Sequence, residues 1–262
     1  MNLEPYRKEI QLTGTAPVRL SVVDVGPLEG ERQGTIVCIH GCAGNLEQWA
    51  PQIAHLSRHY RIIAPDLRGH GRSEVVNSAY SLEEFLWDLT QLLTRLNVAE
   101  PFILMAHSFG GPIAMTFAAS QPQRVSRLIL IATGPEMHLN PLHEWIVKLP
   151  VSLAMLERLR PILMPKTYAP VNVIQKVLAG TLFRWDGRAV LPQVQTPTLI
   201  IAGQWDFIAP VAQARESQQL MPNARLEIVR YTRHLPHLER PEAVNRLIDR
   251  FLAGPRIWRE QQ

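Results

Sequence analysis

The chain has 262 residues, of which 46% are hydrophobic and 19% charged, with a formal net charge of +4. This length and balance fit one α/β domain with an insertion, or two small domains, and are ordinary for a globular enzyme. Arginines are interleaved with acidic residues and form no basic run with aromatics between them, which argues against a nucleic-acid surface. The N-terminus lacks the apolar core of a signal peptide and no apolar stretch approaches the ~18 residues of a membrane span, so we expect a cytoplasmic protein without membrane contact.

The two cysteines, Cys38 and Cys42, are separated by a predicted strand end and the start of the following loop. Two thiols placed in this way are poorly positioned to bridge each other. His40 lies between them, but we interpret it as a residue that shapes the loop and not as a metal ligand. We therefore expect free, reduced thiols and no metal site here.

Short apolar runs alternate with longer helical patterns along most of the chain. Predicted strands cover residues 9–12, 18–25, 35–40, 61–64, 102–106, 127–131, 198–202 and 226–229. Predicted helices cover residues 46–56, 82–96, 110–120, 210–220 and 241–252. Ser81 and Glu84 match a capping box at the start of the second helix.

Several predicted strands, such as 35–39 and 102–105, are continuously apolar, which is typical of strands buried on both faces of a mostly parallel sheet. Together with the alternation of strands and helices, they predict a doubly wound α/β fold with eight strands flanked by helices. We assign residues 1–133 and 191–262 to this core domain.

Residues 134–190 break the alternation. They carry apolar residues at helical spacing, are punctuated by prolines and show no convincing strand pattern. We interpret them as a short helical cap insertion that lies over the C-terminal edge of the sheet. The alternative is two further helices that pack within the main domain.

The most informative segment is residues 106–110, which read Ala-His-Ser-Phe-Gly. A predicted strand precedes it and a predicted helix follows it, which is the context of a nucleophilic serine on a tight, strained turn. Such a turn presents Ser108 at the C-terminal edge of the sheet, above the N-terminus of the helix. A serine that only caps the helix is the alternative.

A nucleophilic serine needs a general base within hydrogen-bond reach, and the base needs an acid to orient it. Asp206 and His234 each follow a predicted strand in the second half of the chain. Because active sites of open α/β sheets collect at the carboxyl ends of strands, we expect Ser108, Asp206 and His234 to form a catalytic triad. His237 is the alternative base, and Glu136 is the alternative acid.

Acyl transfer also needs backbone donors aimed at the developing oxyanion. The Phe109 N–H, directly after the serine, is one candidate for this oxyanion hole. The second is the Cys42 N–H, in a loop whose small residues at 41–44 let the backbone approach a ligand closely.

Taken together, these motifs resemble those of the α/β-hydrolase superfamily over residues 18–253. The markers are His40-Gly41, the run from Asp66 to Ser73, the Ser108 turn, the Asp206 loop, and His234 followed by residues 238–241. Two positions depart from the family pattern, because Ala106 and Arg233 stand where glycine is usual. A serine at 108 also differs from the aspartate nucleophile of epoxide hydrolases and dehalogenases with this fold.

The resemblance is to small capped esterases, lactonases, carbon–carbon hydrolases and cofactor-free perhydrolases. We expect a serine hydrolase that uses no cofactor and cleaves carboxylic esters of small, largely apolar substrates through an acyl-enzyme. Lactone, carbon–carbon and peracid chemistry with the same triad are alternatives, as is a small-molecule receptor that retains the triad. We expect the partner to be a small-molecule ester and the protein to be a monomer or a homodimer.

The side chains expected to bind the substrate come from the first helical segment, the insertion and the loop around Asp206. They are Trp49, Trp145, Leu149, Trp205 and Phe207. For those in the insertion, the alternative is that they pack the cap against the main domain.

Overall fold

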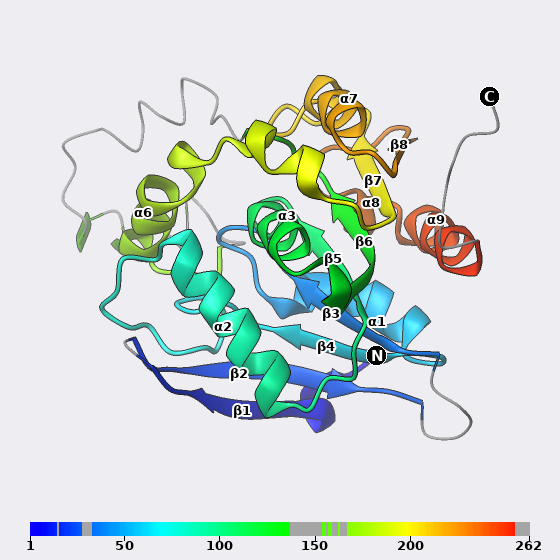
Figure 1. The fold of residues 1–262 in the computed structure, drawn as a ribbon. Coiled ribbons are helices and arrows are strands. Elements are labelled where there is room, and N and C mark those ends of the chain that lie inside the picture. Colours follow the sequence, from blue (N-terminus) through cyan, green and yellow to red (C-terminus); the bar gives the residue numbers. More distant parts are fainter. Residues whose placement is uncertain are drawn as a thin grey trace.

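An eight-stranded sheet with the order β1-β2-β4-β3-β5-β6-β7-β8 forms the centre of the computed structural model (Figure 1). The structure describes residues 1–14, 16–27, 33–136, 154–155, 157–158, 162 and 167–254. β1 pairs antiparallel with β2, β2 pairs antiparallel with β4, and the other neighbouring strands are parallel. The predicted mostly parallel, eight-stranded α/β fold is confirmed.

The strands are β1 (Arg7–Leu12), β2 (Val18–Val25), β3 (Thr35–Ile39), β4 (Arg61–Pro65), β5 (Phe102–His107), β6 (Val125–Ile131), β7 (Thr198–Gly203) and β8 (Ala224–Val229). All the predicted strands are present, but β1, β6 and β8 begin earlier than predicted. Their first residues, Arg7, Val125 and Ala224, pair with β2, β5 and β7 respectively. An apolar pattern in the sequence indicates which residues are buried. The first residue of a strand depends instead on where the neighbouring strand offers hydrogen-bond partners, which the pattern does not show.

The helices are α1 (Ala50–Leu56), α2 (Leu82–Arg95), α3 (Gly110–Ser120), α6 (Val171–Gly180), α7 (Val211–Leu220), α8 (Pro236–Glu239) and α9 (Pro241–Ala253). The helix predicted at 46–56 divides into a 3-10 turn, η2 (Leu46–Trp49), and α1, because Pro51 near the start of α1 cannot continue a preceding α-helical turn. α2 begins with the predicted capping box of Ser81 and Glu84. No helix among the described residues is long and apolar enough to cross a membrane.

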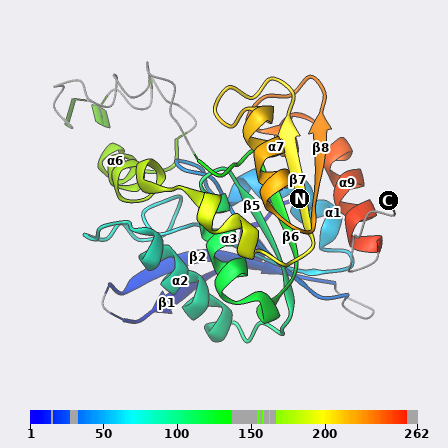
Figure 2. The same cartoon turned by 45° about the horizontal axis from the view of Figure 1, so that its top comes forward.

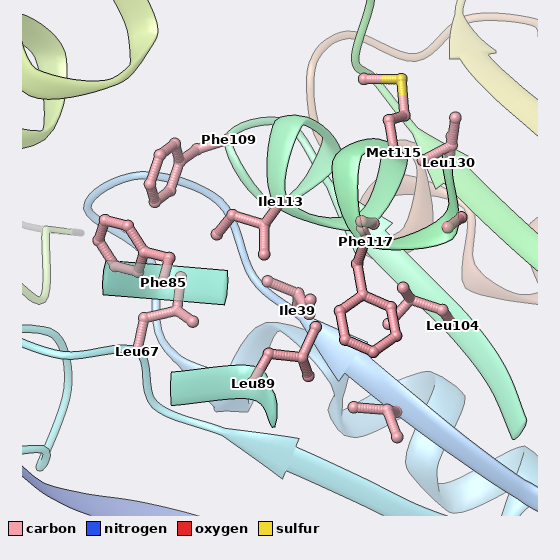
Figure 3. Close-up of a cluster of buried hydrophobic side chains, with 14 of the residues drawn as sticks. Ile39, Leu67, Phe85, Leu89, Leu104, Phe109, Ile113, Met115, Phe117 and Leu130 are labelled. Atoms are coloured by element: carbon pink, nitrogen blue, oxygen red, sulfur yellow. The ribbon is translucent and has the colours of Figure 1, made fainter. Parts of the chain in front are cut away.

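Helices cover both faces of the sheet, which gives three layers (Figure 1 and Figure 2). α2, α3, α6 and α7 contribute to a buried cluster on one face, and α1 and α9 contribute to a second cluster on the other. Figure 3 shows part of the first cluster, where Phe109 and Ile113 lie near Phe85 of α2. The core is therefore divided by the sheet, and the helix after Ser108 belongs to the first half.

β5 illustrates why its sequence is continuously apolar. All of its residues are buried. Leu104 and Ala106 belong to the first cluster, while Ile103 and Met105 belong to the second. Successive side chains of a strand point to opposite faces, so a central strand between two helical layers has no polar face.

The loop from Asp66 to Ser73 ties several elements together beneath the site. Asp66 accepts the Leu46 N–H at 2.8 Å and the Arg72 N–H at 3.0 Å. Arg68 is fully buried and makes two hydrogen bonds of 2.6 Å to Asp88 of α2. A bidentate pair of this kind fixes geometry as well as charge.

The last part of the predicted cap insertion joins the main core. Val173 and Val177 of α6 lie in the first buried cluster with the sheet residues. Just before α6, the Tyr168 N–H donates to the Ala43 carbonyl at 2.8 Å, and the Tyr168 carbonyl accepts the Gly71 N–H at 2.7 Å. Most of residues 137–166 lie outside the described residues, so the cap prediction for that stretch stays a prediction.

Candidate active site

Ser108 lies on the tight turn between β5 and α3. Its φ of +49° is in the left-handed region, which residues with a side chain seldom adopt. The Ser108 N–H donates to the Ile131 carbonyl at 2.9 Å, and the Ser108 carbonyl accepts the Gly111 N–H at 2.8 Å. These bonds hold the strained backbone in the geometry expected of a nucleophile turn.

Small residues around Ser108 are required because neighbouring groups come close. A Cβ at Gly110 would lie 2.6 Å from the Ile39 carbonyl oxygen, and a Cβ at Gly111 would lie 2.1 Å from Thr133 Oγ1. Ala106, which departs from the family pattern, is fully buried within β5.

Ser108, His234 and Asp206 form one hydrogen-bonded chain. The Ser108 hydroxyl donates to His234 Nε2 at 2.9 Å, and His234 Nδ1–H donates to Asp206 Oδ2 at 2.9 Å. We assign the imidazole proton to Nδ1 because a carboxylate only accepts. Ser108 Oγ is thus engaged with His234, and α3 has no side-chain cap bond at its start. The helix-capping interpretation of Ser108 is wrong.

Asp206 is itself fixed by backbone donors. The N–H groups of Ile208 and Ala209 donate to Asp206 Oδ1 at 2.8 and 2.9 Å. The Asp206 side chain is fully buried, whereas the His234 side chain is 19% exposed. The carboxylate therefore has its hydrogen bonds satisfied in the interior, while part of the imidazole remains open to a reactant.

The loop around His234 is braced by a residue that the sequence identified only as part of a family marker. Glu239 accepts the Arg233 N–H at 2.9 Å and the Leu235 N–H at 3.2 Å, one on each side of the histidine. Arg233 is exposed, so its side chain does not crowd the loop. A Cβ at Gly203 would clash with the Arg233 carbonyl oxygen.

The structure does not bring the alternative base and acid into this chain. His237 is fully buried, stacks on Trp49 at a centroid distance of 4.9 Å, and has no hydrogen-bond partner for either ring nitrogen within the described residues. Burial lowers the pKa of His237 to about 3. Glu136 instead pairs with Arg188 at 2.8 Å.

The two predicted oxyanion donors belong to segments that meet at Ser108. A Cβ at Gly41 would lie only 3.2 Å from Ser108 Cβ, so the loop that carries Cys42 packs directly against the serine. Phe109 follows the serine and buries its ring edge-on against Phe85, as Figure 3 shows. Neither the Cys42 nor the Phe109 N–H donates to another group in the described part of the chain.

His40 shapes this loop, as predicted. Its Nδ1–H donates to the Gly41 carbonyl at 2.8 Å, and its Nε2 accepts the Leu67 N–H at 2.9 Å. Burial lowers the pKa of His40 to about 4, despite the hydrogen bond to Gly41. The ring is therefore a neutral link between the Cys42 loop and the loop after β4.

Both thiols are free, as predicted. Burial raises the pKa of Cys42 to about 12 and raises the pKa of Cys38 further above its ordinary value. Both therefore stay protonated at neutral pH and are poor nucleophiles, because the thiolate is the reactive form. Cys42 is available to the site through its backbone N–H and not through its sulfur.

The predicted substrate-binding residues fall in three places. Trp49 is fully buried in the second core cluster, so the structure corrects its assignment from pocket to core. Trp145 and Leu149 lie outside the described residues. Trp205 and Phe207 are 48% and 80% exposed on either side of Asp206.

One residue beside the nucleophile was missed by the sequence interpretation. His107 donates its Nε2–H to the His234 carbonyl at 2.9 Å. Its place directly before Ser108 was the only feature of the sequence that could have pointed to it. The hydrogen bond itself could not be anticipated, because its two residues are 127 positions apart.

Comparison with known proteins agrees with the fold. A sequence model of the α/β hydrolase fold family matches residues 34–163. The dihydrolipoyllysine-residue acetyltransferase component of the acetoin cleaving system of Pseudomonas putida is 30% identical over 247 residues, which cover 86% of this chain and 65% of that protein.

Two solved structures extend the likeness over nearly the whole chain. An esterase from Thermogutta terrifontis is 24% identical with a TM-score of 0.77, covering 94% of this chain and 98% of its own. Est816, described as an N-acyl homoserine lactone degrading enzyme, is 25% identical with a TM-score of 0.76, covering 92% of this chain and 100% of its own. With the sheet order and the turn at Ser108, these matches show that the chain belongs to the α/β-hydrolase superfamily.

Proposed function

We propose that this protein is a serine hydrolase that cleaves carboxylic esters of small, largely apolar substrates. The observation that carries the proposal is the chain of two 2.9 Å hydrogen bonds from Ser108 through His234 to Asp206. An imidazole held between a hydroxyl and a buried carboxylate is the arrangement that activates a serine for attack on a carbonyl.

In the first half of the reaction, Ser108 Oγ attacks the ester carbonyl while His234 Nε2 takes its proton. Asp206 keeps the other imidazole proton on Nδ1 and stabilises the imidazolium that forms. The Cys42 and Phe109 N–H groups donate to the oxyanion of the tetrahedral intermediate, and the positive end of α3 lies beneath it. His234 then protonates the leaving alcohol, which leaves an acyl group on Ser108.

In the second half, water replaces the alcohol. His234 takes a proton from the water as it attacks the acyl carbonyl, and the same backbone donors hold the second oxyanion. Collapse of this intermediate returns the proton to Ser108 Oγ and releases the acid. The proposed cycle uses no cofactor.

Support for an apolar substrate comes from the loop that carries Asp206. Trp205 and Phe207, which precede and follow Asp206 in the sequence, both expose large apolar surfaces, and the Trp205 ring packs edge-on against Tyr231. Exposed aromatic groups beside a reactive centre are available to bind an apolar acyl or alcohol group. Trp145 and Leu149 stay proposed as further contacts from the insertion.

Lactone hydrolysis is the second candidate function. A lactone is a cyclic ester, so the same attack on its carbonyl opens the ring. The observation that favours it is the likeness to Est816 over 92% of this chain. Carbon–carbon bond hydrolysis, peracid formation and a receptor function remain alternatives that a substrate panel separates.

Replacement of Ser108 tests the proposal. We expect Ser108→Ala to lower kcat for p-nitrophenyl butyrate by at least about 10³-fold, because the variant has no nucleophile. Ser120→Ala, at the exposed end of the same helix, is the matched control and should retain wild-type activity. Undiminished ester hydrolysis by Ser108→Ala would refute the assignment.

A panel of short and long esters, lactones and vinylogous diketo acids identifies the reaction class. Many fast turnovers on simple esters indicate an esterase, and a preference for cyclic esters indicates a lactonase. A single slow turnover, with intact labelling of Ser108 by a fluorophosphonate, would instead indicate a receptor that retains the triad. Multiple turnover by the wild type is the result we expect.

A further inference from the structure

The His107 side chain joins the nucleophile turn to the loop that carries the base. It is 3% exposed and lies directly before Ser108 at the end of β5. Its Nε2–H donates to the main-chain carbonyl of His234 at 2.9 Å. Among the described residues this is the one hydrogen bond given to that carbonyl. The bond therefore holds the backbone of the proposed base and not its imidazole.

The acceptor determines the tautomer of His107. A main-chain carbonyl cannot donate, so the proton between the two residues belongs to His107 Nε2. His107 Nδ1 is then an acceptor, and it is buried without a hydrogen-bond partner in the described part of the chain. Burial, helped by the neighbouring His237 and His234 rings, holds the pKa of His107 well below its ordinary value. The ring is thus a neutral donor.

The surroundings of His107 leave its ring little room to move. Its centroid lies 5.0 Å from that of His234 and 4.7 Å from that of His237. On another side, a Cβ at Gly41 would come within 2.7 Å of His107 Nδ1. The ring is therefore confined between the Cys42 loop, His234 and α8. Its Nε2–H points at the His234 carbonyl.

The remaining bonds to this loop explain why the His107 bond matters. Glu239 binds the N–H groups of Arg233 and Leu235, which flank His234 in sequence. The Leu235 N–H and the His234 carbonyl belong to the same peptide group, so the Glu239 bond holds one edge of that group and the His107 bond holds the other. Together they determine where the Cα–Cβ bond of His234 points, and so where its Nε2 meets Ser108.

We propose that His107 is a positioning residue that keeps the His234 imidazole in line with Ser108 by donating Nε2–H to the His234 carbonyl. This inference rests on the proposed serine-hydrolase function, because it assigns a role within that site. It predicts that the donor at the ε position is the essential feature of residue 107, and not the ring or its bulk.

Three substitutions isolate that donor. His107→Gln places an amide N–H at the ε position. His107→Asn carries its amide one bond short, and His107→Met fills the space with a methyl group that cannot donate. We expect His107→Asn and His107→Met to lower kcat for p-nitrophenyl butyrate about 10- to 100-fold, because misplacement of a catalytic group by about 1 Å has an effect of this size. KM should change less than about twofold. We expect His107→Gln to retain most of the wild-type kcat.

A second readout separates this inference from the proposed function. The rate constant for labelling of Ser108 by a fluorophosphonate needs the base but no ester turnover, so it reports positioning even if the wild type hydrolyses no ester. The labelling rate constant should fall for His107→Asn and His107→Met and stay near the wild-type value for His107→Gln, with thermal unfolding confirming that all three variants fold. Wild-type kcat and labelling for His107→Asn and His107→Met, or an impairment of His107→Gln equal to that of His107→Met, would overturn the proposal.

Discussion

Asp206 uses its two carboxylate oxygens for different tasks. Oδ2 accepts the His234 Nδ1–H, and Oδ1 accepts the backbone N–H groups of Ile208 and Ala209. The loop therefore holds the carboxylate in one orientation before any substrate arrives. Only an acceptor at Oδ2 keeps the imidazole in the tautomer whose Nε2 is free to take a proton.

Replacement of the Asp206 carboxylate tests whether it orients the His234 imidazole. Asp206→Asn should leave the fold intact but lower kcat for p-nitrophenyl butyrate by about 10³- to 10⁴-fold, because the amide favours the opposite tautomer of His234. Steady-state kinetics and far-ultraviolet circular dichroism check both parts. Asp186→Asn, which changes an exposed carboxylate near Arg188, is the control and should retain activity. A loss of less than tenfold in Asp206→Asn would show that the carboxylate does not orient the base.

Only some of the residues at the site could be recognised from the sequence. The meeting of Ser108, Asp206 and His234 was predictable because each follows a predicted strand, and the ends of parallel strands meet at one sheet edge. Trp49 was misassigned because an apolar residue on a short helix signals burial but not which side of the sheet it faces. His107 was overlooked because its partner is a carbonyl, which every residue carries.

At the scale of elements, the position of the Cys42 loop depends on the absence of a side chain at residue 41. Gly41 packs against both His107 and Ser108, and a Cβ there would come within 2.7 Å of the His107 ring. That ring is confined by its own contacts, so the loop has to move instead. Movement of this loop would displace the Cys42 N–H from the proposed oxyanion hole.

Gly41→Ala therefore should lower kcat by about 10²-fold, as expected for loss of one oxyanion donor. Gly44→Ala is a matched control on the same loop. Its Cβ would lie 2.9 Å from the end of the Gln48 side chain and 3.1 Å from the Gly41 carbonyl oxygen, without touching the His107 ring or Ser108. We expect its activity to stay within a few-fold of wild type. Equal effects of the two substitutions on kcat would argue against a special role for the loop at position 41.

Element types were easier to predict than element ends. The strands were recognised because β3 and β5 are buried on both faces and leave continuous apolar runs. The start of α1 was misplaced since Pro51 interrupts a pattern of apolar residues that otherwise continues from η2. α8 was not recognised, because a four-residue helix is too short for helical periodicity to show.

At the scale of the whole molecule, folding buries several neutral histidines. Burial is the main cause that lowers the pKa of His40 to about 4, and of His70 and His237 to about 3. In the unfolded chain the pKa of each ring is about 6.5. Between those values the unfolded state binds protons that the folded state does not. Stability is therefore fully present above about pH 6.5 and decreases as the pH falls.

We expect the free energy of unfolding to fall by up to about 1.4 kcal/mol per pH unit for each buried ring below about pH 6. Urea denaturation between pH 7.5 and 5 measures this slope. His237→Phe, which keeps an aromatic ring against Trp49, should reduce the slope of the unfolding free energy against pH by the contribution of one buried histidine. His59→Gln, at an exposed position, should not. A slope that His237→Phe leaves unchanged would contradict this origin of acid sensitivity.

The overall topology could be predicted because parallel strands joined by helices have few ways to assemble. The doubly wound order places β5 between β3 and β6, and adds β7 and β8 beyond β6. What the sequence could not reveal is how deeply the segment around α6 enters the core. Val173 and Val177 are apolar residues at helical spacing, a pattern shared by a cap helix and a core helix.

The order of the strands also determines when the site is completed during synthesis. Ser108 follows the central strand β5, Asp206 follows β7, and His234 follows β8 at the edge of the sheet. A ribosome-bound chain that ends between residues 206 and 234 contains the proposed nucleophile and acid but not the proposed base. The proposed triad is therefore incomplete in nascent chains and in fragments that end before residue 234. Rapid fluorophosphonate labelling of Ser108 would mark only those molecules whose final strand has been added.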